Sequence, residues 1–332
     1  MMLRLSIKVL LLAVVLFIGS IMAAHTWGFY GHKRINRMAV FTLPPEMLTF
    51  YKQHIDYLTE HAVDPDKRRY AVDGEAPRHY IDIDHYAHHG ENVFDIVPRK
   101  WNDAVEKLSE DTLQAYGIVP WHVEKMVWRL TRAFKNEDLD KILRYSAELG
   151  HYVGDAHVPL HTTENYNGQL TNQKGIHGFW ESRLPEMFAT EYDYFVGRAE
   201  YIDDVNTLIW EVVYDSHMAL DSVLTFEREL NERFPSDRKY AYEQRGVSTV
   251  RTYSQDYATE YHTMLNGQVE RRMRTAIRNL GNLWYTAWVD AGQPDLERYN
   301  DKELTDVMKA RIKEAEDEWK ARQKIKGREH AE

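Results

Sequence analysis

Apolar side chains recur every three or four residues along most of this 332-residue chain, which is the spacing of one face of a helix. A short helix is expected from Ile35 to the Pro44–Pro45 pair, and a highly charged one from Glu303. No strand alternation, internal repeat or glycine-rich phosphate loop stands out. The longer predicted helices cover 51–61, 98–134 with a break at YGIVPW, 139–149 and onward, 201–230 and 253–292. The prediction is an all-α fold.

The first 24 residues follow a different pattern. Arg4 and Lys8 precede the apolar run 9–18, and small residues follow up to Ala23–Ala24. This pattern predicts a secretory signal peptide over 1–24, with an uncleaved anchor as the alternative. The domain would then span 25–300, followed by a charged helical tail over 301–332. We expect a secreted or periplasmic protein that is not inserted in a membrane after cleavage.

The cysteine content and net charge of the chain limit which classes of function are expected. The chain has no cysteine, so an exported form would rely on its core or on bound metal for stability. Its formal net charge is −10, and loss of 1–24 would remove two basic residues and no acidic ones. A general basic surface for nucleic acid is therefore excluded, although bound divalent cations can reverse the charge locally.

The candidate chemistry is concentrated in residues 150–184. His151 and Asp155 are four residues apart, and so are His177 and Glu181. Residues at i and i+4 share one face of a helix, and imidazole with carboxylate is a typical set of zinc ligands. One such pair is more often a surface contact. Two pairs close together are harder to explain by solvation alone.

A further histidine lies between the two pairs. Pro159 should end the first helix and leave His161 on the turn that follows. The polar run TENYNGQLTNQKG reads as a loop that lets a second helix, starting near Gly175, bring its own pair toward the first. Five ligands are too few for two metal ions, so additional ligands are predicted elsewhere in the chain.

Candidates for these ligands occur nearer the N-terminus. Trp27 and His32 follow the presumed cleavage site, Asp64 lies in VDPDKRRY, and His79 opens the motif HYID. Each is a weak signal alone, because Asp and His in loops are commonly just solvated.

The order of these motifs resembles that of the zinc-dependent phospholipase C and S1/P1 single-strand nuclease superfamily. The matching features are Trp-x4-His, an Asp, HYID, HYVGDAHVPLH and a His-x3-acidic pair, over roughly 27–190. The resemblance implies one multi-helical domain with a cluster of three zinc ions in a cleft. It assigns the first zinc to Asp64, His79, His151 and Asp155, the second to His161, His177 and Glu181, and the third to the amine and carbonyl of Trp27 with His32 and Asp155.

Two details qualify these implied ligands. Cleavage after Ala24 would make His25 the first residue instead of Trp27, so we expect a third zinc that is lost more easily than the others. His157 occupies a position where the family also has a histidine. It is two residues from Asp155 and is expected to point away from the metals.

The resemblance also implies the reaction, which is hydrolysis of a phosphodiester by zinc-activated water. Asp64 would position or deprotonate that water, and Lys67 or Arg68 would stabilise the pentavalent phosphorus. The family tends to have an arginine three residues after its aspartate, and Lys67 departs from this.

The substrate class stays open. As in the nucleases, HYID places Tyr80 to stack on a base and Asp82 to read its edge, although core packing and capping of a turn are the alternative roles. Glu181 resembles the bacterial phospholipases. We expect cleavage of single-stranded nucleic acid or 3′-nucleotides, with phospholipase C activity as the alternative and a non-catalytic exported zinc-binding protein as a third possibility. No obligate protein partner is implied.

Overall fold

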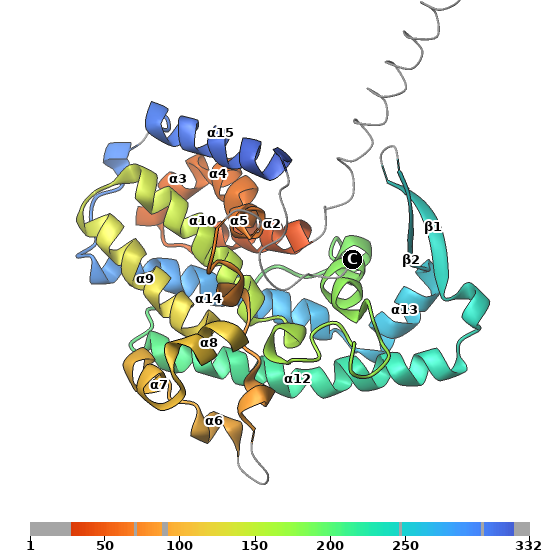
Figure 1. Ribbon diagram of the computed structural model, residues 1–332. Coiled ribbons are helices and arrows are strands. Elements are labelled where there is room, and N and C mark those ends of the chain that lie inside the picture. The colour runs from red at the N-terminus through yellow and green to blue at the C-terminus, as the bar shows by residue number, and fades with distance from the viewer. Residues whose placement is uncertain (1–27, 70–71, 88–91, 246–247, 300–301, 322–332) are drawn as a thin grey trace, which may run out of the picture.

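The computed structural model describes residues 28–69, 72–87, 92–245, 248–299 and 302–321. The expected signal peptide over 1–24 and Trp27 lie outside these residues. Within them, helices joined by turns carry nearly all of the regular structure, as the apolar spacing predicted (Figure 1). The only sheet in these ranges is a two-stranded hairpin.

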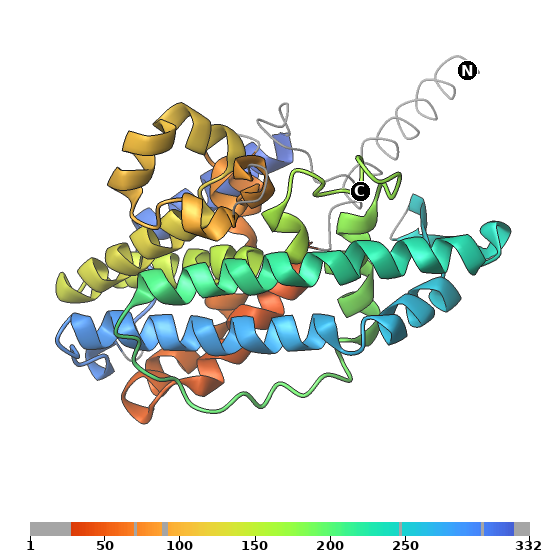
Figure 2. The ribbon, with the colours of Figure 1, turned by 90° about the horizontal axis from the view of Figure 1, so that it is seen from below.

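The framework consists of four long helices: α9 (Val119–Lys135), α10 (Leu139–Ala156), α12 (Val205–Arg233) and α14 (Gln268–Asp290). α9 and α10 pack against each other, and α14 packs against both. α12 and α14 run antiparallel and side by side (Figure 2), joined by the Arg272 guanidinium, which donates to Val212 O over 3.2 Å. Trp210 and Trp284 are fully buried between these elements.

The N-terminal part consists of α2 (Gly28–Ala39), η2 (Val40–Thr42), α3 (Pro45–Gln53), α4 (Ile55–Glu60), η3 (His61–Val63) and α5 (Asp64–Arg68). α2 approaches α10 closely, where α10 presents two glycines. A Cβ at Gly150 would lie 1.8 Å from Asn36 Oδ1, and one at Gly154 would lie 2.7 Å from His32 Nδ1. These glycines therefore allow the contact that brings His32 beside α10.

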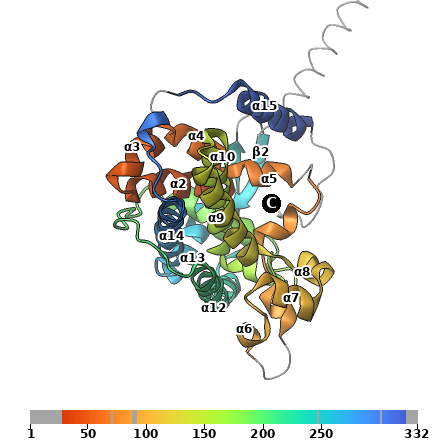
Figure 3. The ribbon, with the colours of Figure 1, turned by 90° about the vertical axis from the view of Figure 1, so that its left-hand side faces the viewer.

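Short elements follow: η4 (Ala76–His79), η5 (Ile83–Tyr86), α6 (Val93–Ile96), α7 (Trp101–Leu108) and α8 (Glu110–Tyr116). α6, α7 and α8 group together at one side of the molecule (Figure 3). The side chains of Asn92 and Ser109 accept hydrogen bonds from the first turns of α6 and α8. Gly117, with φ +94°, separates α8 from α9, which confirms the break predicted at YGIVPW.

Three elements continue from α10 toward the site: η6 (Pro159–Thr162), the π-helical turn η7 (Gly178–Arg183) and α11 (Leu184–Phe188). α10 ends at Ala156, before Pro159 as expected. His177 directly precedes η7, and Glu181 lies within it. π-Helical turns are rare and are often found at functional sites.

Two predictions for the C-terminal half were wrong. Residues 240–253 form the antiparallel hairpin of β1 (Tyr240–Arg245) and β2 (Ser248–Tyr253), where no strand was expected. The helix expected over 253–292 is divided into α13 (Gln255–Met264) and α14, because Asn266 (φ +47°) and Gly267 (φ +74°) both adopt left-handed conformations. The turn η8 (Ser236–Arg238) links α12 to the hairpin.

The chain closes with η9 (Glu297–Tyr299) and α15 (Asp306–Ala321). α15 packs on α5 (Figures 1 and 3), with Met308 buried and the Trp319 ring 6.3 Å from that of Phe29. No helix in the described ranges has both the length and the apolar character needed to cross a bilayer.

Candidate metal centre

Asp155 is the central residue of a buried polar group. Its Oδ2 lies 2.9 Å from His79 Nδ1 and 3.2 Å from His151 Nε2, and its Oδ1 lies 3.3 Å from His32 Nε2. Oδ2 is buried and forms no hydrogen bond with any described residue, even though two imidazole nitrogens are so close. Short separations without hydrogen-bond geometry are the arrangement expected of atoms that share a cation.

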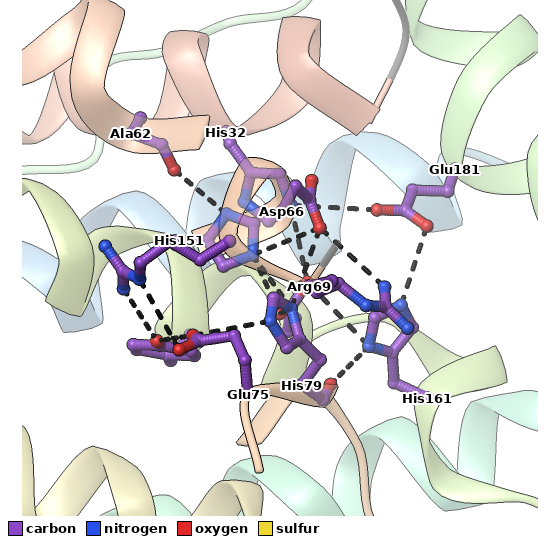
Figure 4. A network of polar contacts seen from close by, with 12 residues as sticks. His32, Ala62, Asp66, Arg69, Glu75, His79, His151, His161 and Glu181 are labelled. Atoms are coloured by element: carbon purple, nitrogen blue, oxygen red, sulfur yellow. Dashed lines mark hydrogen bonds and ion pairs between the residues drawn. The ribbon is translucent and has the colours of Figure 1, made fainter. Parts of the chain in front are cut away.

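Asp66 completes the first set of ligand atoms. Its Oδ1 lies 3.6 Å from His151 Nε2 and 3.7 Å from His79 Nδ1, and those two nitrogens are 3.0 Å apart. Figure 4 shows the carboxylate of Asp66 facing these rings from α5. Asp66, His79, His151 and Asp155 thus converge from three separate elements.

The second set lies on η6 and η7. His177 Nε2 is 2.7 Å from Glu181 Oε2 and 3.2 Å from His161 Nε2. The two sets are adjacent, because His161 Nδ1 lies 3.7 Å from Asp155 Oδ1 and Glu181 Oε1 lies 3.8 Å from His32 Nε2. His32, Asp155 and Glu181 therefore form a third group between them.

Backbone carbonyls orient three of the histidines. Nδ1 of His151 lies 2.9 Å from Ala62 O, and Nδ1 of His177 lies 3.0 Å from Tyr166 O. His161 Nδ1 lies 2.5 Å from the carbonyl of His79. In the neutral form of each ring, donation from Nδ1–H leaves the Nε2 lone pair facing the group, which is the tautomer and orientation of a metal ligand.

The donor set fits zinc. It combines five imidazoles with three carboxylates and contains no sulfur, whereas calcium and magnesium sites are built from oxygen. Zinc–nitrogen bonds of about 2.0–2.1 Å in a tetrahedron place neighbouring ligand atoms about 3.3 Å apart. The separations of 2.9–3.7 Å between ligand atoms of His79, His151, Asp155 and Asp66 are close to that value.

Neighbouring histidines favour the ionised forms of Asp155 and Glu181. Burial by itself raises the pKa of Asp155, but the neighbouring His151 and His161 hold that pKa well below its usual value. Burial also opposes ionisation of Glu181, and hydrogen bonds from His161 and His177 likewise hold its pKa well below normal. Burial lowers the pKa of His151, but the charges of Asp155 and Asp66 outweigh it and raise the value to about 9.

The structure places the predicted ligand Asp64 apart from the clustered histidines. Asp64 is in none of the potential ligand groups of the described residues. Its Oδ2 instead lies 2.6 Å from His61 Nδ1, and its Oδ1 accepts from Lys67 Nζ over 2.9 Å. Asp66, two residues later, faces the histidines instead, and an arginine, Arg69, follows it at the spacing of three where Asp64 is followed by Lys67. The sequence therefore offers Asp66 with Arg69 as the alternative to Asp64 with Lys67.

The two predicted catalytic cations are held by carboxylates outside the ligand groups. Lys67 pairs with Asp64, and Arg68 donates to Glu148 Oε1 over 2.8 Å. Arg69 is the nearest cation to the group, buried at 3 % exposure with its Nη1 3.7 Å from Asp66 Oδ1.

Tyr80 and Asp82 are both buried, at 8 % and 6 % exposure. The Tyr80 hydroxyl donates to Ala115 O over 3.4 Å, and the Asp82 N–H donates to Tyr116 O over 2.7 Å. The described conformation therefore presents little of either side chain to a base. Their role in reading a substrate stays a prediction.

Sequence reasoning missed Glu75. This fully buried carboxylate lies 3.7 Å from Nε2 of His79 (Figure 4), whereas the other ring nitrogen, Nδ1, faces Asp155. It also accepts hydrogen bonds from the Tyr152 hydroxyl and, over 2.6 Å, from Arg78. Burial raises the pKa of Glu75, but His79, Arg68 and Arg78 hold it far below normal, so its charge is available to orient His79.

Asp66 and Glu181 are the two ligand side chains of the group that reach solvent. The side chains of Asp66 and Glu181 are 21 % and 14 % exposed, whereas those of His32, His79, His151, Asp155 and the remaining histidines are at most 4 % exposed. Gly28, where the described chain begins, lies beside Asp66, since a Cβ there would be 3.7 Å from Asp66 Oδ2. Trp27 precedes it and is outside the described residues, so its role as a ligand stays a prediction.

His157 points away from this group, as expected. Its Nδ1 lies 2.7 Å from Val153 O, and its Nε2 accepts from Asn279 on α14 over 3.1 Å.

With this geometry established, comparison with known families identifies the chain. The model of the family S1/P1 Nuclease matches residues 27–276, which include every residue of the potential ligand groups. The chain belongs to the S1/P1 nuclease family. S1/P1 nucleases are in general zinc-dependent hydrolases of phosphate esters, which agrees with the donor set. A search of curated proteins found no match.

Proposed function

We propose that this S1/P1 nuclease family member hydrolyses phosphodiester bonds of single-stranded nucleic acid, or the phosphate of 3′-nucleotides, at a centre of up to three zinc ions. The observation that carries the proposal is the position of Asp155, whose two oxygens face different histidines. The family match favours nucleic acid over phospholipid as the substrate.

The proposed ligands follow the geometry. Asp66, His79, His151 and Asp155 would hold one zinc, His161, His177 and Glu181 a second, and His32 with Asp155 and the Trp27 backbone a third. Bound zinc lowers the pKa of water and neutralises charge on a phosphate. Because the third set depends on a residue close to the chain terminus, we expect it to lose its ion most readily.

The chain's own residues would contribute positioning and proton transfer. Asp66 is the most exposed carboxylate of the group, so it is placed to orient an incoming water and accept its proton. Arg69, whose Nη1 lies 3.7 Å from Asp66 Oδ1, would orient the Asp66 carboxylate. Glu75 would hold the His79 ring in its orientation through Nε2, the ring nitrogen that does not face Asp155. Residues 1–24 are proposed to direct export, and 25–300 to form the catalytic domain.

Phospholipase C activity is the second candidate. It rests on Glu181, which occupies a position where the nucleases tend to have aspartate. The extra methylene brings Oε2 within 2.7 Å of His177 Nε2 while Oε1 stays 3.8 Å from His32.

A parallel assay tests the proposal. Zinc-loaded protein is incubated with single-stranded DNA, RNA, a 3′-nucleotide and phosphatidylcholine, with Asp66→Asn as the inactive control. We expect cleavage of the nucleic acids with little release of choline phosphate. Choline phosphate released while nucleic acid stays intact would favour the phospholipase. Zinc retention without any hydrolysis would favour the non-catalytic protein.

A further inference from the structure

The β1–β2 hairpin is attached to the segment that carries His177 and Glu181. The Arg183 guanidinium, two residues after Glu181, forms a double hydrogen bond with the Glu243 carboxylate on β1. Tyr253 on β2 stacks on Phe179 at 3.8 Å between ring centroids and 13° between planes. The base of the hairpin is thereby fixed against η7, next to the metal centre.

One face of this hairpin presents aromatic and basic groups to solvent. Tyr242 and Arg251 are directly opposite each other in the strand pairing, so they lie on the same face. Tyr242 is 76 % exposed, and Arg251 is exposed as well. Glu243, the only acidic residue of the two strands, points to the other face and is paired with Arg183.

Arg251 is held in a defined orientation. Its guanidinium carbon lies 3.7 Å from the centroid of the Tyr240 ring, and no carboxylate among the described residues pairs with it. Stacking of this kind leaves the guanidinium N–H groups free at its edges, where they can bind phosphate oxygens. Lys174 is exposed, and the adjacent Gly175 faces Tyr253 on β2, since a Cβ there would lie 3.5 Å from the Tyr253 hydroxyl.

We propose that this hairpin face binds the part of a single-stranded nucleic acid that extends beyond the cleaved bond. Tyr242 stacks on a base, and Arg251 pairs with a backbone phosphate. The inference rests on the proposed nuclease function and deepens it, because it makes a polymer a better substrate than a dinucleotide. An exposed ring beside an unpaired planar cation is the combination that binds single strands without sequence preference.

The charge of the surface supports nucleic acid as the occupant. The chain as a whole carries a formal net charge of −10, which repels a polyanion. Arg251 is the only charged residue that the two strands place on this face, and Lys239, which pairs with Glu227, lies over the same Tyr240 ring. This face is therefore a favourable place for a phosphate close to η7. A membrane surface is the competing occupant, because an exposed tyrosine beside an arginine also suits a lipid interface.

The test compares long and short substrates on the zinc-loaded full-length protein. We expect Tyr242→Ala and Arg251→Gln each to lower kcat/KM for dT20 about tenfold and to leave that for TpT unchanged. Arg251→Gln should also reduce the slope of log(kcat/KM) for dT20 against log[salt] by about 0.7, the value for one phosphate contact. Tyr242→Phe, which keeps the ring, should behave as wild type. Tyr201→Ala, an exposed tyrosine bonded to Asp290 elsewhere, is the matched control.

Binding is recorded separately so that the two proposals can fail independently. Stopped-flow anisotropy of labelled dT20 measures association before turnover, and we expect about tenfold weaker binding by Tyr242→Ala. Equal dT20 binding by wild type and both variants would overturn the hairpin inference, whether or not TpT is cleaved. Weaker binding of the variants to phosphatidylcholine vesicles, with dT20 binding unchanged, would also overturn the inference, because the hairpin would then be a lipid contact. Failure of wild type to cleave TpT and dT20, with binding still dependent on Tyr242, would contradict only the nuclease function.

Discussion

Asp155 Oδ1 lies 3.3 Å from His32 Nε2, which links the helix at the start of the described chain to the C-terminal end of α10. The other oxygen of the same carboxylate faces His79 and His151. One side chain therefore belongs to two ligand groups. This relationship makes the site a single centre, and the predictions below concern the residues that maintain it.

The contact between His32 and α10 depends on Gly154. We expect Gly154→Ala to displace the His32 ring, because the new Cβ would lie 2.7 Å from Nδ1. The variant should lose about one zinc per chain under mild chelation, measured by elemental analysis, while keeping the others. Gly31→Ala on α2 is the control, since a Cβ there meets nothing within 4 Å and alanine favours a helix by up to about 1 kcal/mol. Equal zinc content in the two variants would refute the proposed role of His32.

The choice between Asp64 and Asp66 gives a second prediction. Asp66→Asn should lower kcat at least about 100-fold, because it removes both a ligand and the proposed proton acceptor. Asp64→Asn should retain activity and lose only partly exposed contacts with His61 and Lys67, at a cost of about 0–1 kcal/mol in stability. Steady-state kinetics and thermal unfolding measure the two effects. The reverse pattern would restore Asp64 as the functional residue.

Glu75 supports a prediction with a close control. Glu75→Gln should weaken zinc binding about 10–100-fold, because it removes the charge behind His79. Glu148→Gln removes the other carboxylate that binds Arg68, but among the described residues His79 pairs with Asp66, Glu75 and Asp155 and not with Glu148, so zinc affinity should stay near wild type. Competition with a chelator of known affinity measures both. An identical decrease in the two variants would indicate a general effect of the Arg68 network.

The raised pKa of His151 predicts coupling between protons and zinc. In the metal-free protein this pKa is about 9, above the value of about 6.5 expected after unfolding. The stabilisation from charged His151 is thus complete below about pH 6.5 and is lost as pH rises through 9. Zinc needs the neutral ring, so binding at pH 7.5 should release about one proton from this residue. Calorimetry in two buffers of different ionisation enthalpy measures the release, and a buffer-independent heat would contradict it.

The sequence predicted the parts of the site whose geometry is local. His151 with Asp155 and His177 with Glu181 are separated by four residues, and helical geometry alone places such pairs together. The end of α10 before Pro159 followed from the missing N–H of proline.

Other parts depended on tertiary contacts. Asp64 and Asp66 stand on the same short helical turn, and only the packing of α5 against α10 decides which carboxylate faces His151. Glu75 lies in a turn where the apolar residues show no helical period. Its burial depends on Tyr152, which is distant in the sequence, and on the nearby Arg78.

The hairpin was missed for a different reason. Its strands alternate in YAYEQR and STVRTY, but both are short and lie between strong helices. The helical period was extended across Gly267 although glycine favours a left-handed break there.

The most direct test of the account is a crystal structure of the zinc-loaded protein with anomalous scattering measured on both sides of the zinc edge. We predict separate zinc peaks in the group centred on Asp155. One should be bordered by Asp66, His79 and His151, and another by His161, His177 and Glu181. Absence of zinc from these residues, or zinc bound instead by Asp64, would contradict the central claim.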